Sequence, residues 1–164
     1  MATWDSYITG MIMNKQLPDG TWLQNMVQEA AIITFEGAIA ACTPGFELKT
    51  YDYTIKIDDV NTKTVKVDEK EILLALAKKG DSKVSEAGIR INDVKYMLAN
   101  HNPDLKVAYL SKTKGGACIM CTNSVIIYAA FYTDLKMSNG VAQNAGICNT
   151  AVDSVGQLLL SSGA

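Results

Sequence analysis

Apolar residues recur at helical spacing at both ends of the chain. Near the N-terminus they are Trp4, Tyr7, Ile8, Met11 and Ile12, and near the C-terminus they are Ala151, Val152, Val155 and Leu159. Steps of three and four residues gather such side chains on one face of a helix. Terminal segments fray unless they are held, so we predict that both helices bury their apolar faces on one shared core.

Strand patterns fill the region after the first helix. A turn is expected at 16–20 and a buried strand at 30–34, with 38–41 returning beside it as the second arm of a hairpin. Apolar and polar residues alternate most clearly over 51–67, around a turn at 58–61. This alternation predicts a second hairpin with one apolar face and one polar, solvent-exposed face, and the hairpin could extend beyond the body of the domain.

Residues 68–80 predict a helix, because acidic side chains lead, lysines trail and Gly80 ends the segment. A polar loop is expected at 81–87. Short apolar strands then follow at 88–91, 94–99, 105–111, 116–121 and 124–132, separated by polar or glycine-containing turns. Such a series is typical of an antiparallel meander. After a polar loop at 133–146 comes the last helix, and the whole order predicts one α+β domain over 1–164.

Composition indicates a folded protein and narrows its partners. Of the 164 residues, 48% are hydrophobic and 20% are charged, the net charge is −2 and the pI is near 5.3. This length supports a full core, and the acidic balance argues against nonspecific binding to nucleic acid or acidic membranes. No apolar run approaches the ~20 residues that span a bilayer, and no secretory signal is visible, so we expect a cytoplasmic protein.

Cys118 and Cys121 have the spacing of a redox or metal-binding pair. Zinc needs four ligands, however, and the only histidine, His101, lies near no second cysteine pair. The alternative is that both are buried strand residues, since positions i and i+3 of a strand point to opposite faces. We favour this alternative, and with Cys42 and Cys148 we expect four reduced thiols and no metal site.

The sequence offers no set of catalytic residues. It has one histidine and lacks a nucleophile elbow, a phosphate-binding loop and a dinucleotide fingerprint. We therefore expect a binding protein that needs no cofactor, and not an enzyme.

Several short motifs in a fixed order resemble profilin, a family of small proteins that bind actin monomers. They are Trp4-Asp5-Ser6-Tyr7, Ala30-Ala31-Ile32-Ile33 with Phe35-Glu36-Gly37, Gly88-Ile89-Arg90-Ile91 with Lys95-Tyr96-Met97, Lys112-Thr113-Lys114-Gly115-Gly116, and Gly146-Ile147-Cys148-Asn149. The motifs cover most of the chain. The resemblance implies a profilin-like antiparallel sheet, with the N- and C-terminal helices packed together on one face and a further helix on the other.

The segment from about 49 to 70 is longer than in animal or plant profilins. It resembles the additional β-hairpin of apicomplexan-type profilins, which place Thr-Lys-Thr after an acidic turn, here Thr62-Lys63-Thr64 after Asp58-Asp59. The resemblance therefore implies a protist, alveolate-like member. Two interpretations of this hairpin stand side by side: an arm that contacts actin, which we favour, and a solvated insertion of the kind that loops tolerate.

The resemblance implies monomeric actin as the main partner. Positions that match the family's actin-binding residues are Lys95, Lys112, Gly146, Asn149 and Asp153. Cationic positions of animal profilins are occupied here by Leu110, Asn100 and Thr150, so electrostatic steering toward acidic actin is expected to be weaker. The plain alternative for each lysine is a solvated surface charge.

The resemblance also implies a groove between the terminal helices for proline-rich, formin-like partners, whose polyproline II helices pack against flat rings. Trp4 and Tyr7 match two groove positions, and Leu158 and Leu159 on the last helix stand where the family has an aromatic residue or histidine followed by leucine. The alternative for the two rings is that they anchor the first helix in the core. Ile39 replaces a tryptophan of many profilins, and the chain ends at Ala164 without an aromatic residue. Each lost ring costs about 1 kcal/mol, so binding of proline-rich ligands is predicted to be weak or altered.

A second hypothesis is a PAS-like ligand-binding domain or a roadblock-type dimerisation module with a similar α+β layout. A large apolar cavity or a dimerising exposed strand would favour it. Phosphoinositide binding, known in profilins, is expected to be weak because the lysines are scattered. We expect a monomer.

Overall fold

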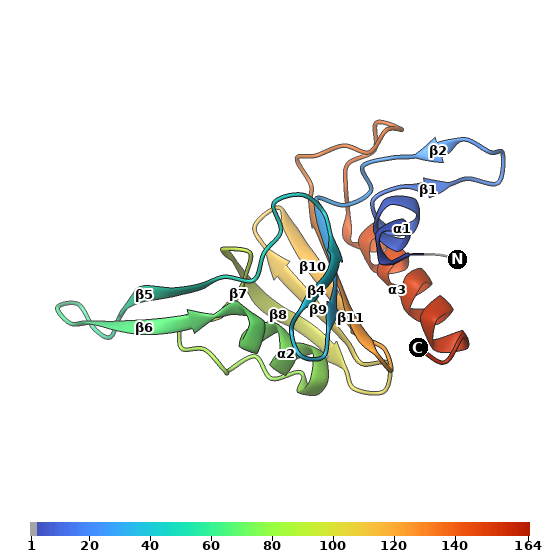
Figure 1. Ribbon diagram of the computed structural model, residues 1–164. Helices are drawn as coiled ribbons and strands as arrows, with labels where there is room; N and C mark the ends of the chain where they lie inside the picture. Colours follow the sequence, from blue (N-terminus) through green and yellow to red (C-terminus); the bar gives the residue numbers. More distant parts are fainter. Residues whose placement is uncertain (1–2) are drawn as a thin grey trace.

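A computed structural model describes residues 3–164; Met1 and Ala2, at the start of the predicted first helix, lie outside the described residues. The centre is a seven-stranded antiparallel sheet of order β4-β3-β11-β10-β9-β8-β7 (Figure 1). Its strands are β3 (Glu29–Thr34), β4 (Ile39–Cys42), β7 (Ile89–Ile91), β8 (Val94–Asn102), β9 (Val107–Lys112), β10 (Gly115–Cys121) and β11 (Val125–Tyr132). The predicted meander from β7 to β11 is confirmed.

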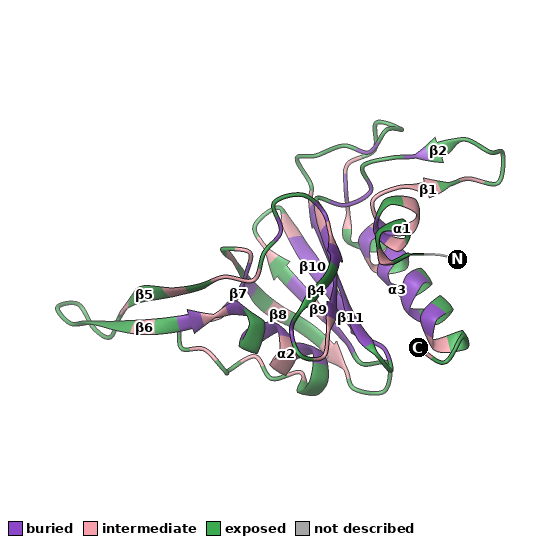
Figure 2. Cartoon of the chain, viewed as in Figure 1, coloured by how far each residue is buried: buried purple, intermediate pink, exposed green. Residues whose placement is uncertain are grey.

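The two faces of this sheet are covered by different helices (Figure 1). On one face pack α1 (Trp4–Tyr7), the π-helical turn η1 (Ile8–Ile12) and α3 (Ala145–Ser161); on the other packs α2 (Glu69–Lys79). Along β11, Ile127 and Ala129 enter the first core while Ile126 and Tyr128 enter the second. The predicted fold, with both terminal helices on one face and a further helix on the other, is confirmed. In Figure 2 the buried residues accordingly follow the sheet and the inner sides of the helices.

Capping residues set the ends of α2 and the start of α3. The Asp68 side chain accepts the Glu71 N–H at the start of α2, and Gly80 ends that helix with φ +66°, a left-handed conformation that suits glycine. Asn144 caps α3 in the same way by accepting the Ile147 N–H. Because of this cap, α3 begins at Ala145, two residues earlier than predicted.

Three short features differ from the prediction. The first helix continues as a π-turn, in which the Met13 N–H donates to the Ile8 carbonyl. The turn at 16–20 is flanked by β1 (Lys15–Gln16) and β2 (Trp22–Leu23), which are too short for a periodic pattern. Strand β8 reaches Asn102 and not 99, because a bulge between Leu98 and Asn100 interrupts its alternation.

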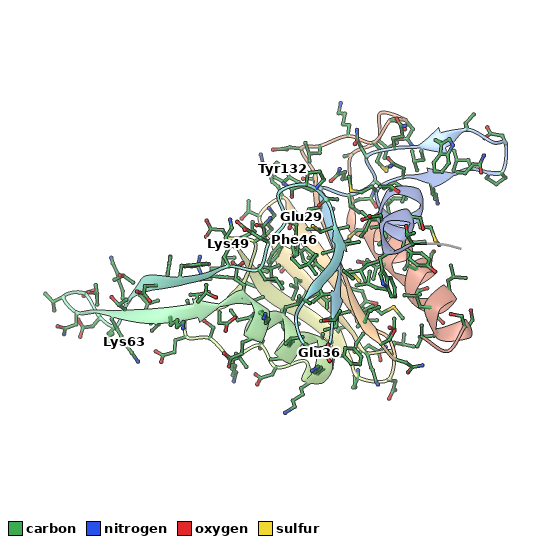
Figure 3. The ribbon with its side chains drawn as sticks, in the orientation of Figure 1. Glu29, Glu36, Phe46, Lys49, Lys63 and Tyr132 are labelled. Carbon is green, nitrogen blue, oxygen red and sulfur yellow. The ribbon has the colours of Figure 1, made fainter. Side chains whose placement is uncertain are left out.

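The predicted extra hairpin, β5 (Thr50–Lys56) with β6 (Thr62–Asp68), forms its own two-stranded sheet and reaches away from the body (Figure 1). Lys63 lies out on this hairpin, far from Glu29 and Phe46 at the sheet (Figure 3). The Tyr53 ring stacks on the Arg90 guanidinium of β7, with 3.9 Å between the guanidinium carbon and the ring centroid. This contact joins the hairpin to the edge of the main sheet.

Glu69 joins three separate parts of the fold. Its side chain is fully buried at the start of α2. The carboxylate accepts the backbone N–H groups of Lys49 (2.8 Å), Asn92 (2.9 Å) and Asp93 (2.7 Å), and the Tyr51 hydroxyl lies 3.4 Å away. These donors belong to the root of the hairpin and to the turn between β7 and β8. A buried carboxylate needs such partners, and here they are mostly fixed backbone groups.

A second polar network is buried on the α2 side of the sheet. The Tyr128 hydroxyl donates to Glu29 (3.2 Å) and lies 3.1 Å from the Tyr96 hydroxyl. Asn92 donates to the same carboxylate at 3.2 Å. Burial raises the pKa of Glu29, and these hydrogen bonds oppose that rise.

Cys118 and Cys121 point to opposite faces of β10, one into each core, so the interpretation as two buried strand residues is confirmed. All four thiols are free. Burial raises the pKa of Cys118 to about 12, which keeps that thiol protonated at neutral pH. None of the helices between residues 3 and 164 has the length and apolar character that crossing a membrane requires.

We predict that Glu69→Ala lowers the free energy of unfolding by about 2–4 kcal/mol. The substitution leaves buried backbone N–H groups without an acceptor, both at the root of the hairpin and in the turn between β7 and β8. Glu71→Ala is the matched control: it removes an exposed carboxylate from the same first turn of α2. Urea denaturation followed by circular dichroism measures both. Equal losses in the two variants would show that the Glu69 hydrogen bonds do not hold the fold.

Candidate functional site

Helix α3 covers only part of the sheet face on which it packs. Helix α3 packs mainly on β10 and β11, and on the same face β8 and the end of β9 at Ser111 stay exposed. Tyr96 and Leu98 of β8 point into the α2-side core, so Lys95 and Met97 between them point to the open side. Met97 is 71% exposed and lies opposite Ser111 in the ladder. We call this surface, made by Lys95, Met97, Ser111 and Tyr109, the open sheet face.

A depression of about 220 Å³ lies where the open sheet face meets α3. Tyr109 and Cys118 line it from the sheet, Leu105 lines it from the turn between β8 and β9, and Asn149 and Asp153 line it from the helix. Tyr109 is partly buried there, and burial raises the pKa of its hydroxyl. The depression is therefore apolar at its floor and polar at its helical wall.

The structure brings most of the predicted actin-binding residues to this region. Asn149 and Asp153 are one helical turn apart and line the same depression. Gly146 is exposed in the first turn of α3, on the same side of the helix. Lys95 is exposed on the open sheet face.

Lys112 is placed differently from the other four residues. It follows Leu110 by two positions in β9, and Leu110 points into the α2-side core. Its ammonium lies 5.1 Å from the centroid of the Tyr132 ring. Lys112 and Lys95 therefore share one end of the sheet but point to opposite faces.

The second predicted site lies along the terminal helices. The rings of Trp4 and Tyr7 have centroids 5.9 Å apart, and both side chains are half-buried against the core under α1 and α3. Ile39 at the neighbouring edge strand is 38% exposed, and Leu158 on α3 is 46% exposed. We call Trp4, Tyr7, Ile39 and Leu158 the terminal groove, after the site that the resemblance implies for these positions. Each ring packs on the core and keeps an exposed side, so the structure supports the core interpretation in part, and the groove interpretation stays a prediction.

Leu159 corrects the predicted groove. It is only 3% exposed and belongs to the core cluster of α3, so its side chain is not available to touch a ligand. One position along a helix turns a side chain by about 100°, which separates buried Leu159 from exposed Leu158. The stripe of Val152, Val155 and Leu159 noted in the sequence already contained this information.

Sequence reasoning missed Met97, Tyr109 and Leu105 as surface residues of the site. Leu105 is 51% exposed and lies beside the depression that Tyr109 lines. Met97 had a signal, because it falls on the polar side of an alternating strand. Neither surface has the geometry of a metal centre, since residues 3–164 hold no group of three or more His, Cys, Asp or Glu side chains suited to a metal ion.

Comparisons with known proteins agree with this architecture. The profilin family model matches residues 2–164. The chain is 32% identical to the profilin of Tetrahymena pyriformis over 164 residues, which covers 99% of each protein.

Solved structures show the same fold. Acanthamoeba castellanii profilin IB superposes with a TM-score of 0.65 at 15% identity, covering 99% of this chain and all of that one (100%). Mouse profilin IIa, solved in complex with a double repeat from the FH1 domain of mDia1, superposes with a TM-score of 0.52 at 16% identity, covering 91% and 94% of the two chains. On this evidence the chain belongs to the profilin family, whose members are non-enzymatic actin-binding proteins.

Proposed function

We propose that this profilin binds an actin monomer through the open sheet face and the adjoining half of α3. The observation that carries the proposal is the continuity of this surface, which runs from Lys95 and Met97 through Tyr109 to Asn149 and Asp153. It combines exposed apolar area with a polar rim, as protein interfaces do. The family relationship identifies the class of partner.

The surface has fewer cations than the resemblance to animal profilins would suggest. Leu110 is 4% exposed in the α2-side core, so this position adds no charge. Met97 offers a large apolar side chain that a partner can bury. We infer that apolar contact carries more of the affinity here, while Lys95 contributes charge on the open sheet face and Lys112 contributes charge from the opposite face at the same end of the sheet.

The β5–β6 hairpin is proposed as an additional arm toward actin. Arg90, which holds Tyr53 of the hairpin, lies directly opposite Lys95 in the β7–β8 ladder. The arm therefore leaves the body beside the open sheet face. Its tip carries Ile57 (62% exposed) and Val60 (89% exposed), whose apolar side chains are mostly exposed and can be buried by a partner.

We propose that proline-rich ligands, such as the FH1 segments of formin-like proteins, bind weakly at the terminal groove. Two rings remain there, and Ile39 and Leu158 offer aliphatic surface in place of flat rings.

Family membership gives no support to the alternative of a PAS-like or roadblock-type scaffold. It does place the protein with cytoplasmic, cytoskeleton-associated proteins. Weak phosphoinositide binding and a monomeric state remain predictions.

We predict that Lys95→Glu combined with Lys112→Glu weakens actin-monomer binding about tenfold, since reversing each charge at this end of the sheet costs about 0.5–1 kcal/mol. The dissociation constant is measured by fluorescence anisotropy of labelled actin monomers. Lys79→Glu combined with Lys83→Glu makes the same charge change on the α2 side and should leave affinity within about twofold. If the first double variant binds as tightly as the parent, these lysines are not in the site.

We predict that replacing 52–66 by Asn-Gly lowers actin affinity and leaves the fold intact. Tyr51 and Val67 are paired partners, so a two-residue turn can join them. Ile57→Ser with Val60→Ser tests the tip alone, without removing a strand. Actin sedimentation measures both, and thermal melting checks the fold. Full affinity in both variants would identify the hairpin as a solvated insertion.

We predict that plain decaproline binds far more weakly than micromolar, and that Ile39→Trp tightens binding about fivefold by restoring one ring. Anisotropy of a labelled decaproline measures both. Ile57→Trp adds the same ring on the hairpin and should change nothing. Micromolar affinity of the unmodified protein would refute the prediction of weak binding.

A further inference from the structure

A small apolar pocket lies between the first helix and α3, beyond the aromatic pair. Its volume is about 140 Å³, and residues that line it include Met11, Lys15, Met26, Ile147, Ala151 and Ser154. Two methionines and an isoleucine give it adaptable apolar walls. The volume suits a single aliphatic side chain of about leucine size.

The pocket lies on the same flank of α3 as the terminal groove. Ile147, Ala151, Ser154 and Leu158 follow one another at steps of four, three and four residues, which places them in one stripe along the helix. Val155 and Leu159 beside this stripe are buried, so the stripe is the rim of the α3 surface next to the first helix. The pocket thus continues the groove toward the start of α3.

Lys15 is the charged residue at this pocket. It lies in β1, opposite Leu23. Within residues 3–164 the ion pairs are Lys63–Glu86 and Lys114–Asp134, and neither includes Lys15. Its ammonium is therefore available to an acidic group of a bound ligand.

We propose that this pocket is a second subsite for proline-rich ligands, which accepts an aliphatic side chain next to an acidic residue at one end of the proline segment. The proposal rests on the proposed terminal groove. Leu158 and Ala151 are about 10 Å apart along the helix axis, and a polyproline II helix rises ~3.1 Å per residue. The aliphatic residue therefore lies about three residues beyond the last proline in the groove.

This subsite explains how a profilin with few groove rings can select a partner. Flat-ring stacking recognises proline repeats in general, whereas a pocket with one cation recognises a particular flanking sequence. Plain proline repeats would then be weak ligands, and the flanking residues would supply both affinity and specificity.

The test compares decaproline with decaproline extended by Pro-Pro-Leu-Glu at the C-terminus or Glu-Leu-Pro-Pro at the N-terminus. NMR of methionine methyl groups reports the pocket through Met11 and Met26, and the Trp4 indole N–H reports the groove. We expect one extended peptide to bind about tenfold more tightly than decaproline and to shift both reporters, whereas decaproline shifts only the Trp4 signal.

Two variants locate the effect. Ser154→Leu narrows the pocket from an exposed helix position, and Lys15→Glu reverses its charge. Each variant should bind the extended peptide only as tightly as decaproline and should keep the affinity of the parent protein for decaproline. The matched controls, Gln157→Leu on another side of α3 and Lys83→Glu on the α2 side, should keep the tenfold difference.

The outcomes separate the subsite from the groove. Equal binding of all three peptides, with only the Trp4 signal moving, overturns the subsite and leaves the groove standing. Movement of the Met11 and Met26 signals without Trp4 supports the pocket and overturns the groove. If neither reporter moves with any peptide at millimolar concentration, both proposals fall.

Discussion

The buried carboxylate of Glu69 is the interaction on which the positions of the functional surfaces depend. It holds the first turn of α2, the root of the hairpin at Lys49 and the turn between β7 and β8 within one set of hydrogen bonds. That turn has positive φ at both Asn92 and Asp93, which is the geometry of a tight two-residue hairpin. By fixing it, Glu69 fixes the register in which Lys95 lies opposite Arg90.

The open sheet face and the arm are consequently parts of one rigid corner. Arg90 carries the hairpin through its contact with Tyr53, and its ladder partner Lys95 belongs to the open sheet face. A carboxylate that accepts backbone N–H groups is set by the chain path and does not depend on side-chain rotamers at the donors. For a partner that binds both surfaces, as proposed, these contacts at the root of the hairpin would lower the cost of ordering it.

Much of this fold was predictable from periodicity, and the failures have physical reasons. Alternation over 51–67 and the helical stripe at the C-terminus each depend on one element alone. The faces of Lys95 and Lys112 depend on strand pairing and on the bulge in β8, which a single sequence does not reveal. The structural role of Glu69 could not be predicted from the sequence. An acidic residue in the first turn of a helix is expected because it interacts favourably with the helix dipole, and no neighbouring residue indicates that this one is buried.

The two surfaces have changed in the same direction relative to the residues that the family resemblance implies. The open sheet face has fewer cations and exposes Met97, while the terminal groove has fewer rings and exposes Ile39 and Leu158. Charges act over about 10 Å at moderate salt and mainly speed encounter, whereas aliphatic contacts act only once surfaces touch. Replacing charges by aliphatic contacts therefore slows association of the two proteins more than it speeds their dissociation. The two proposed sites would therefore recognise their partners by shape at short range, and the proposed pocket beside the groove would add one cation, Lys15, to such apolar contact.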